Sequence, residues 1–190
     1  MQKSIYSIIL AAGEGKRYKN GIKLLHTIGD KFMLQMVINL VKSCNFDKNY
    51  IVVNPLWNFI KDNFVVPDNF FILKNKNYKE GISTSIKLAI KEIKSTNILP
   101  EYVAIFLADM PFIKKEDIKT LKKYCNGRHL IIAPFFNNKK GFPTFVHKSL
   151  FDEIFKLEND IGIKQIINKN PSLLTKVNFS TNRILRDIDD

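Results

Sequence analysis

Short apolar segments alternate along the chain with longer segments in which apolar residues recur every three or four positions. The short segments are rich in β-branched and aromatic residues and end at glycine, proline or asparagine, which is typical of buried strands. We expect such strands at 5–10, 50–53, 70–73, 102–107 and 130–133. The longer segments predict amphipathic helices, and these lie around 33–41, 82–93 and 115–124.

The last third of the chain mixes shorter elements. The pattern there predicts a strand at 144–146, helices at 150–157 and 162–168, and extended segments at 173–179 and 184–188. Strands that alternate with helices predict an α/β fold, with a mostly parallel central sheet covered by helices on both faces. The sequence contains no repeat, low-complexity stretch or linker, so we expect residues 1–190 to form one domain.

Composition adds a strong positive charge to this picture. The 190 residues carry a net charge of +12, which favours contact with an anionic molecule. The lysines are spread along the whole chain, however, so a solvated surface explains most of the excess. A nucleic-acid-binding module is not favoured, because its basic residues should cluster with aromatic platforms. No apolar stretch approaches the roughly 20 residues that cross a bilayer. We therefore expect neither nucleic acid nor a membrane as a partner, the first because the basic residues do not cluster and the second because no segment could span it.

The cysteines and histidines do not suggest a metal centre. Cys44 and Cys125 are the only cysteines, and the three histidines are isolated from one another. Without a C-x-x-C pair or a ligand-like spacing, a zinc site is not expected. Two scattered cysteines favour reduced thiols in a cytoplasmic enzyme.

A basic, glycine-rich loop follows the first predicted strand. Gly13 and Gly15 would let backbone N–H groups approach a phosphate closely. Arg17 could contact phosphate oxygens with a two-pronged guanidinium, and Lys23 with a compact ammonium. The loop does not match G-x-x-x-x-G-K-[ST], and Tyr18 replaces the last glycine of the dinucleotide pattern G-x-G-x-x-G. Taken alone, it could also be a glycine turn with solvated lysines.

One carboxylate, Asp109, follows the apolar strand predicted at 102–107. Ligands of open α/β sheets bind beyond the carboxyl ends of the strands, where the glycine-rich loop is also expected. Mg²⁺ commonly takes one or two protein carboxylates and completes its shell with substrate phosphates and water. Asp109 therefore suits a magnesium site, and its position also suits a turn or a helix cap before Pro111.

Six segments match a family pattern in order along the chain. They are Leu10-Ala11-Ala12-Gly13-x-Gly15-x-Arg17 with Lys23, Asn75-x-x-Tyr78-x-x-Gly81-x-x-x-Ser85, Leu107-Ala108-Asp109-Met110-Pro111-Phe112-Ile113, Gly141-Phe142-Pro143, Asn159-Asp160-x-Gly162-x-Lys164 and Asp187-Ile188-Asp189. In these segments the chain resembles the molybdenum cofactor cytidylyltransferases, which belong to the Rossmann-like nucleotidyltransferases. The resemblance covers nearly the full chain.

The resemblance implies roles for the matching positions. Leu10, Ala11, Ala12 and Gly13 would border the nucleotide, Gly15, Arg17 and Lys23 would hold the triphosphate, and Gly81 and Ser85 would frame the base. Asp109 would bind Mg²⁺ together with an acid of the closing segment, Asp189 or else Asp187. Without the family pattern, Ser85 would be assigned to the outer face of its helix, and a solvated tail would explain the closing acids as well as a metal site does.

The implied reaction transfers CMP from CTP to the phosphate of molybdopterin and releases pyrophosphate. Arg17, Lys23 and Asp109 would supply the catalytic charges, and a molybdoenzyme or its chaperone would receive the product. Three alternatives stay open. The first is the guanylyltransferase branch, which Ala12 disfavours because that branch carries a second glycine there. The others are a sugar- or polyol-phosphate nucleotidyltransferase and a nucleotide-binding regulator or chaperone.

Overall fold

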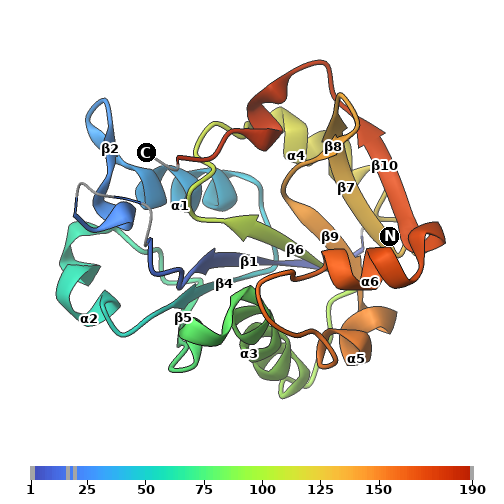
Figure 1. Ribbon diagram of the computed structural model, residues 1–190, viewed down its shortest axis with the longest axis horizontal. Helices are drawn as coiled ribbons and strands as arrows, with labels where there is room; N and C mark the ends of the chain where they lie inside the picture. Colours follow the sequence, from blue (N-terminus) through green and yellow to red (C-terminus); the bar gives the residue numbers. More distant parts are fainter. Residues whose placement is uncertain (1–2, 16–17, 19–20, 189–190) are drawn as a thin grey trace.

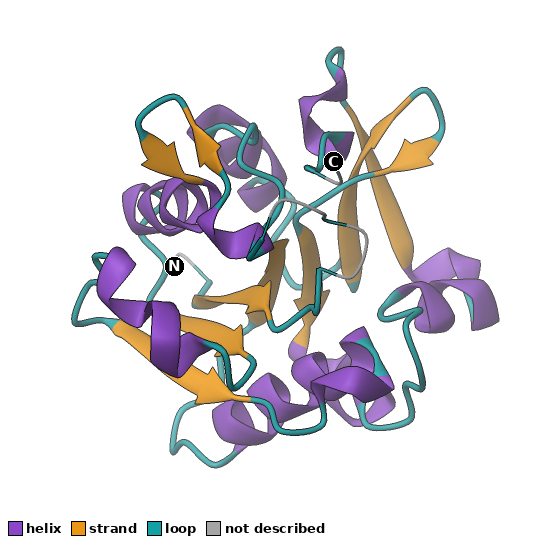
Figure 2. Ribbon diagram, turned by 60° about the vertical axis from the view of Figure 1, so that its left-hand side comes forward, coloured by secondary structure: helices purple, strands orange, loops and turns teal. Residues whose placement is uncertain are grey.

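The fold is built on an eight-stranded sheet. The computed structural model describes residues 3–15, 18 and 21–188. Seven strands follow the order β10-β7-β9-β6-β1-β4-β5, and β8 pairs with β7. The strands are β1 (Ile5–Ala11), β4 (Lys48–Val53), β5 (Phe70–Lys74), β6 (Tyr102–Leu107), β7 (Ile131–Phe136), β8 (Lys139–Lys140), β9 (Thr144–His147) and β10 (Leu174–Asn178). Two further short strands, β2 (Thr27–Ile28) and β3 (Lys31–Phe32), form a hairpin apart from the sheet (Figure 2).

Most neighbouring strands run parallel. β1 pairs in parallel with β4 and β6, β4 with β5, and β7 with β10. β9 is antiparallel to both β6 and β7, so these two strands still point the same way. The carboxyl ends of β1, β4, β6 and β7 therefore lie at one edge of the sheet. This arrangement confirms the predicted α/β fold with a mostly parallel sheet.

Helices cover both faces of the sheet (Figure 1). In the described residues these are α1 (Met33–Ser43), α2 (Trp57–Ile60), α3 (Ile82–Lys94), α4 (Lys115–Lys122), α5 (Phe151–Ile154) and α6 (Lys164–Lys169). α1 and α4 lie on one face, whereas α3, α5 and α6 lie on the other. None of the described helices is both long and apolar enough to span a membrane.

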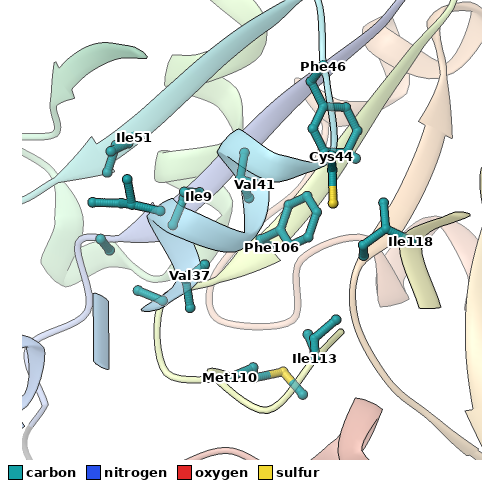
Figure 3. Packing of buried hydrophobic residues seen from close by; sticks show 14 of the residues in the cluster. Ile9, Val37, Val41, Cys44, Phe46, Ile51, Phe106, Met110, Ile113 and Ile118 are labelled. Carbon is teal, nitrogen blue, oxygen red and sulfur yellow. The ribbon is translucent and has the colours of Figure 1, made fainter. Parts of the chain in front are cut away.

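The two faces of the sheet have separate hydrophobic cores. Alternate residues of a strand point to opposite faces, so Phe106 of β6 joins the core beneath α1 and α4, and its neighbour Ile105 joins the core beneath α3, α5 and α6. We call these the α1 core and the α3 core. Figure 3 shows Val37 and Val41 of α1 packed over the strands of the α1 core. Burial of both sheet faces explains why the strands are almost continuously apolar.

The structure corrects the prediction for the end of the chain. Residues 184–188 were expected to be extended, but Asn182–Leu185 forms a 3-10 turn and residues 186–188 join no strand. The helix expected at 150–157 is limited to α5, with a 3-10 turn before it. The strand predicted at 130–133 is longer in the structure, where β7 extends through Pro134 to Phe136. Proline has no backbone N–H, but the pairing of β7 with β9 ends at Ile132, so no hydrogen bond to β9 is lost.

A buried ion pair fastens the C-terminal segment to α4. The Asp117 side chain, 2% exposed, accepts hydrogen bonds from Arg183 Nε at 2.7 Å and Nη2 at 2.6 Å. Asp117 also caps α4 by accepting from the Lys114 backbone N–H at 2.9 Å. Three residues beyond Arg183, the Arg186 guanidinium lies 4.0 Å from the centre of the Phe112 ring. These contacts hold residues 182–188 in place without a partner strand.

We predict that Asp117→Asn lowers the free energy of unfolding by on the order of 2–4 kcal/mol, because it leaves the Arg183 guanidinium without its buried counter-charge. Urea denaturation monitored by circular dichroism measures this change. Asp152→Asn is the matched control, since it breaks an ion pair with Lys94 that lies at the surface. The control should leave the midpoint unchanged, and an equally harmless Asp117→Asn would contradict the prediction.

Candidate active site

A pocket of about 850 Å³ opens at the carboxyl ends of β1, β4 and β6. Ten residues were assigned to the nucleotide from the sequence. Nine of them line this pocket: Leu10, Ala11, Ala12, Gly13, Gly15, Lys23, Gly81, Ser85 and Asp109. The tenth, Arg17, lies outside the described residues. The structure thus brings together positions that are up to 99 residues apart in the chain.

An ion pair joins the glycine-rich loop to the end of β6. Lys23 Nζ lies 2.8 Å from Asp109 Oδ2, and the two side chains are 16% and 26% exposed. Lys23 begins a 3-10 turn after the loop, and Asp109 follows β6 by two residues. A cation and a carboxylate therefore face the same pocket, as the resemblance implies for the triphosphate and metal sites.

The second oxygen of Asp109 lacks a hydrogen-bond donor among the described residues. Oδ1 is buried and accepts no hydrogen bond from any residue that the structure describes. A buried carboxylate oxygen without a donor carries a desolvation cost that a bound cation would offset. Within the described residues, no group of three or more His, Cys, Asp or Glu side chains could hold a metal by itself. Asp109 fits an ion such as Mg²⁺ that takes its other ligands from phosphates and water.

The loop that carries Asp109 is anchored on two sides. Met110 and Ile113 are buried in the α1 core (Figure 3). On the other side, the Ile188 N–H donates to the Asp109 carbonyl at 3.0 Å. The closing acidic segment therefore reaches the candidate metal site, with Asp187 directly before this contact. Asp189, the preferred second metal ligand, lies outside the described residues, and its role stays a prediction.

Asn54 is a site residue that the sequence did not reveal. Its buried side chain donates from Nδ2 to the carbonyls of Ala12 at 3.3 Å and Gly13 at 3.4 Å. Its Oδ1 accepts from the Leu56 N–H at 3.0 Å. These bonds fix the point at which the glycine-rich loop leaves β1. Asn54 could have been recognised as an amide residue at the end of a strand that neighbours β1. The sequence pattern suggested only a turn there.

Asn75 holds Ser85 inside the pocket. Asn75 Nδ2 donates to Ser85 Oγ and to Thr84 Oγ1, both at 2.9 Å, and its Oδ1 accepts from the Asn77 N–H. Ser85 is 4% exposed and lines the pocket. This position excludes the alternative that Ser85 lies on the outer face of α3.

Gly81 is packed directly against the loop at 159–160. Its φ of +106° is strained for other residues, and a Cβ there would lie 2.4 Å from the carbonyl carbon of Asn159. The same loop caps α3, because Asn159 O accepts from the Ser83 N–H at 3.2 Å and Asp160 Oδ1 from the Ile82 N–H at 3.0 Å. Two segments of the sequence pattern therefore form one wall of the pocket.

The Gly141–Pro143 turn contacts the C-terminal segment and is not part of the pocket lining. A Cβ on Gly141 would lie 2.2 Å from the Ile184 carbonyl oxygen, and that oxygen accepts from the Phe142 N–H at 3.0 Å. Only glycine fits such a close approach. This turn therefore helps to position residues 184–188, which lead to Asp109.

We predict that Gly81→Ala lowers the free energy of unfolding by about 2–4 kcal/mol, because it combines a strained φ with a clash against backbone atoms. It should also weaken nucleotide binding, since the pocket wall must shift. Gly29→Ala is the control: it has a φ of +63° and open space around the added methyl, so only the conformational cost of about 1–2 kcal/mol remains. Equal losses in the two variants, measured by urea denaturation, would refute the packing argument.

Known proteins match most of this chain in sequence. A family model described as MobA-like NTP transferase domain matches residues 7–174. Among curated proteins, the bifunctional protein GlmU of Wolbachia sp. subsp. Brugia malayi is 30% identical over 159 residues, which are 80% of this chain and 37% of GlmU. GlmU of Buchnera aphidicola subsp. Acyrthosiphon pisum is 35% identical over 152 residues, 78% of this chain and 31% of GlmU. The chain thus spans about a third of the length of these relatives.

Solved structures share the fold at low sequence identity. The Mycobacterium sp. strain JC1 homologue of Rv0371c superposes with a TM-score of 0.83 at 22% identity, covering 97% of this chain and 90% of that one. Rv0371c of Mycobacterium tuberculosis in complex with manganese has a TM-score of 0.77 at 14% identity, covering 93% and 88%. The 4-diphosphocytidyl-2C-methyl-D-erythritol synthase of Anaerococcus prevotii has a TM-score of 0.73 at 14% identity, covering 100% and 92%.

Proposed function

This chain belongs to the family of MobA-like NTP transferase domains, and on that premise we propose that it transfers a nucleoside monophosphate from a nucleoside triphosphate to a phosphorylated acceptor. We propose CTP as the donor. The observation that carries the proposal is the convergence of the glycine-rich loop, Lys23 and Asp109 in one pocket. A regulator that only binds nucleotide would not need this paired cation and carboxylate beside the triphosphate loop.

The proposed chemistry is a single displacement at phosphorus. An oxygen of the acceptor phosphate attacks the α-phosphorus, the bond from that phosphorus to the bridging oxygen of the β-phosphate breaks, and pyrophosphate leaves with the electron pair. The acceptor phosphate is already largely ionised near neutral pH, so no strong general base is required. The protein then contributes mainly by positioning the two substrates and stabilising negative charge.

Lys23, Arg17 and Asp109 are the charged groups assigned to this task. Lys23 would contact the triphosphate with its compact ammonium, and Arg17 would contact it with its guanidinium. Asp109, with Asp189 or else Asp187, would hold Mg²⁺, and the unpartnered Oδ1 supports this assignment within the described residues. When bound, the metal supplies positive charge that stabilises the leaving pyrophosphate. The manganese complex of Rv0371c, which shares the fold, also supports a divalent cation.

Two features support cytidine as the base. Ala12 lines the pocket, and by the family resemblance the guanylyltransferase branch would carry a second glycine at this position. The name of the Anaerococcus prevotii protein describes a diphosphocytidyl product on the same fold. Gly81 and Ser85 would frame the base, with Ser85 held by Asn75.

For the acceptor we propose molybdopterin, on the strength of the six matching sequence segments. A molybdoenzyme or its chaperone would then receive the product. The second candidate is a phosphorylated sugar or polyol, which is favoured by the methyl-erythritol product named for the Anaerococcus prevotii neighbour. The pocket residues named above would treat the nucleotide in the same way with either acceptor.

We predict that CTP with Mg²⁺ raises the melting temperature of the protein more than GTP or ATP does, because a ligand stabilises the state that binds it. A pyrophosphate-release assay should then cross the four nucleoside triphosphates with molybdopterin and several sugar and polyol phosphates. Release should require CTP together with one class of acceptor. Nucleotide binding without release in any combination would instead support the regulator.

We predict that Asp109→Asn lowers the rate of pyrophosphate release by about 100-fold or more, since it removes a charge next to the reacting phosphates. The circular dichroism spectrum should be unchanged, because the side chain lies at a pocket and is not in the core. Asp30→Asn serves as the matched control, as Asp30 is an exposed carboxylate between β2 and β3. A wild-type rate in Asp109→Asn would eliminate the metal assignment.

A further inference from the structure

Tyr18 and His26 join the glycine-rich loop to the turn that carries Lys23. Tyr18 Oη and His26 Nδ1 lie 2.7 Å apart and share a hydrogen bond. The two rings also meet edge to face, with their planes at 90°. Tyr18 belongs to the loop and lines the pocket, whereas His26 directly follows the 3-10 turn Lys23–Leu25 and is not among the residues that line it. The hydrogen bond therefore connects a residue of the candidate site to one outside it.

A second contact fastens the start of the loop to the same turn. Gly15 has a φ of +61°, and a Cβ on it would lie 3.0 Å from Lys23 Cβ. The Gly15 carbonyl also accepts a hydrogen bond from the Tyr18 N–H at 2.9 Å. Tyr18 is thus tied to Gly15 through its backbone and to His26 through its side chain. The described part of the loop meets the Lys23 turn at two separate points.

His26 further connects this turn to helix α1. Its N–H donates to the Lys23 carbonyl at 3.0 Å, and its own carbonyl accepts from the Met33 N–H at 2.7 Å. Met33 is the first residue of α1 and is fully buried. The Lys23 ammonium in turn contacts Asp109 at 2.8 Å. His26 therefore relates the Tyr18 side chain both to a buried helix and to the backbone that presents Lys23 to Asp109.

The charge of the loop explains why neutral groups make these contacts. Residues 13–23 carry four basic side chains and one acidic side chain, a net charge of +3. Like charges within one loop repel each other, so other contacts are needed to keep the loop folded onto Lys23. A carboxylate partner would hold the loop equally well, but it would also repel a bound triphosphate. A tyrosine hydroxyl and a glycine packing contact hold the loop without adding negative charge.

We propose that Tyr18 and His26 are positioning residues, which hold the glycine-rich loop against the Lys23 turn in the arrangement that binds the triphosphate. The proposal rests on the proposed function and adds two residues that organise its phosphate site. Ordering a flexible loop costs conformational free energy. A loop that is ordered before the nucleotide arrives binds it more tightly, because binding no longer supplies that ordering. We call these two residues the Tyr18–His26 pair.

The test measures the affinity of full-chain variants for CTP and for CMP, each with Mg²⁺, by isothermal titration calorimetry. Tyr18→Phe and His26→Phe each remove the hydrogen bond and keep an aromatic ring. Each should raise the Kd for CTP by about fivefold or more. The Kd for CMP should change by less than about twofold, because CMP lacks the β- and γ-phosphates that the loop is assigned to hold. A general disturbance of the pocket would instead weaken both ligands.

A conservative variant and a double variant separate positioning from a structural role. His26→Asn places an amide group where the imidazole has Nδ1, so its Kd for CTP should return to within about twofold of the wild type. The double variant Tyr18→Phe/His26→Phe should bind CTP about as weakly as either single variant, since both changes remove the same bond. Tyr124→Phe is the matched control. Tyr124 also meets a histidine ring edge to face, at His129, but it does not line the pocket, and the Kd should stay unchanged.

An unchanged Kd for CTP in either Tyr18→Phe or His26→Phe would overturn the pair. A loss in Tyr18→Phe alone would mean that the hydroxyl contacts the nucleotide directly, and losses that add in the double variant would mean that the two residues act separately. If His26→Phe fails to fold, Tyr18→Phe and His26→Asn decide the question. A wild-type protein that binds none of the four nucleoside triphosphates would overturn the proposed function. Inorganic triphosphate titrated into the same variants would then test the pair by itself.

Discussion

The Asp109 carboxylate imposes the constraint on which the candidate site depends. One of its oxygens is bound by Lys23 and the other is buried without a donor from the described chain. Such a group is unfavourable unless its surroundings hold it rigidly, because a mobile loop would turn the carboxylate towards water. The rigidity comes from β6, from Met110 and Ile113 in the α1 core, and from the Ile188 backbone. Part of the stability of the fold thus holds a carboxylate oxygen buried without a hydrogen-bond donor from the described chain.

Contacts outside the pocket also help to hold the Asp109 loop in place. The Asp117–Arg183 pair and the Gly141–Ile184 contact lie outside the pocket lining, yet both fix the segment whose Ile188 N–H holds the Asp109 carbonyl. On the nucleotide side, Asn54 and Asn75 do comparable work for the glycine-rich loop and for Ser85. Neutral amides suit this role, because they can donate and accept at once without adding charge to the pocket.

The sequence predicted those parts of the structure that depend on local pattern. Strand β6 matches its predicted bounds, since an apolar run buried on both faces leaves a continuous signal. The pocket residues were predicted because glycines and an aspartate next to strand ends can be recognised in the sequence alone. The C-terminal segment and Asn54 were not found, because their conformation and role follow from contacts between residues far apart in the chain. Such contacts leave no periodic pattern of apolar residues in the sequence.

The excess positive charge shows why position matters more than composition. Lys122 and Lys140 both have a pKa lowered by burial. Lys122 donates to the Cys44 carbonyl at 2.7 Å and the Asn45 carbonyl at 3.2 Å, at the C-terminal end of α1, where the helix dipole stabilises a cation. Its charge is therefore accounted for by the fold. Lys140 has one carbonyl, one hydroxyl and the face of the Phe142 ring as partners, and the charge of Lys164 opposes its own. The two lysines thus differ in their charged neighbours, because Asp47 raises the pKa of Lys122 whereas Lys164 lowers the pKa of Lys140.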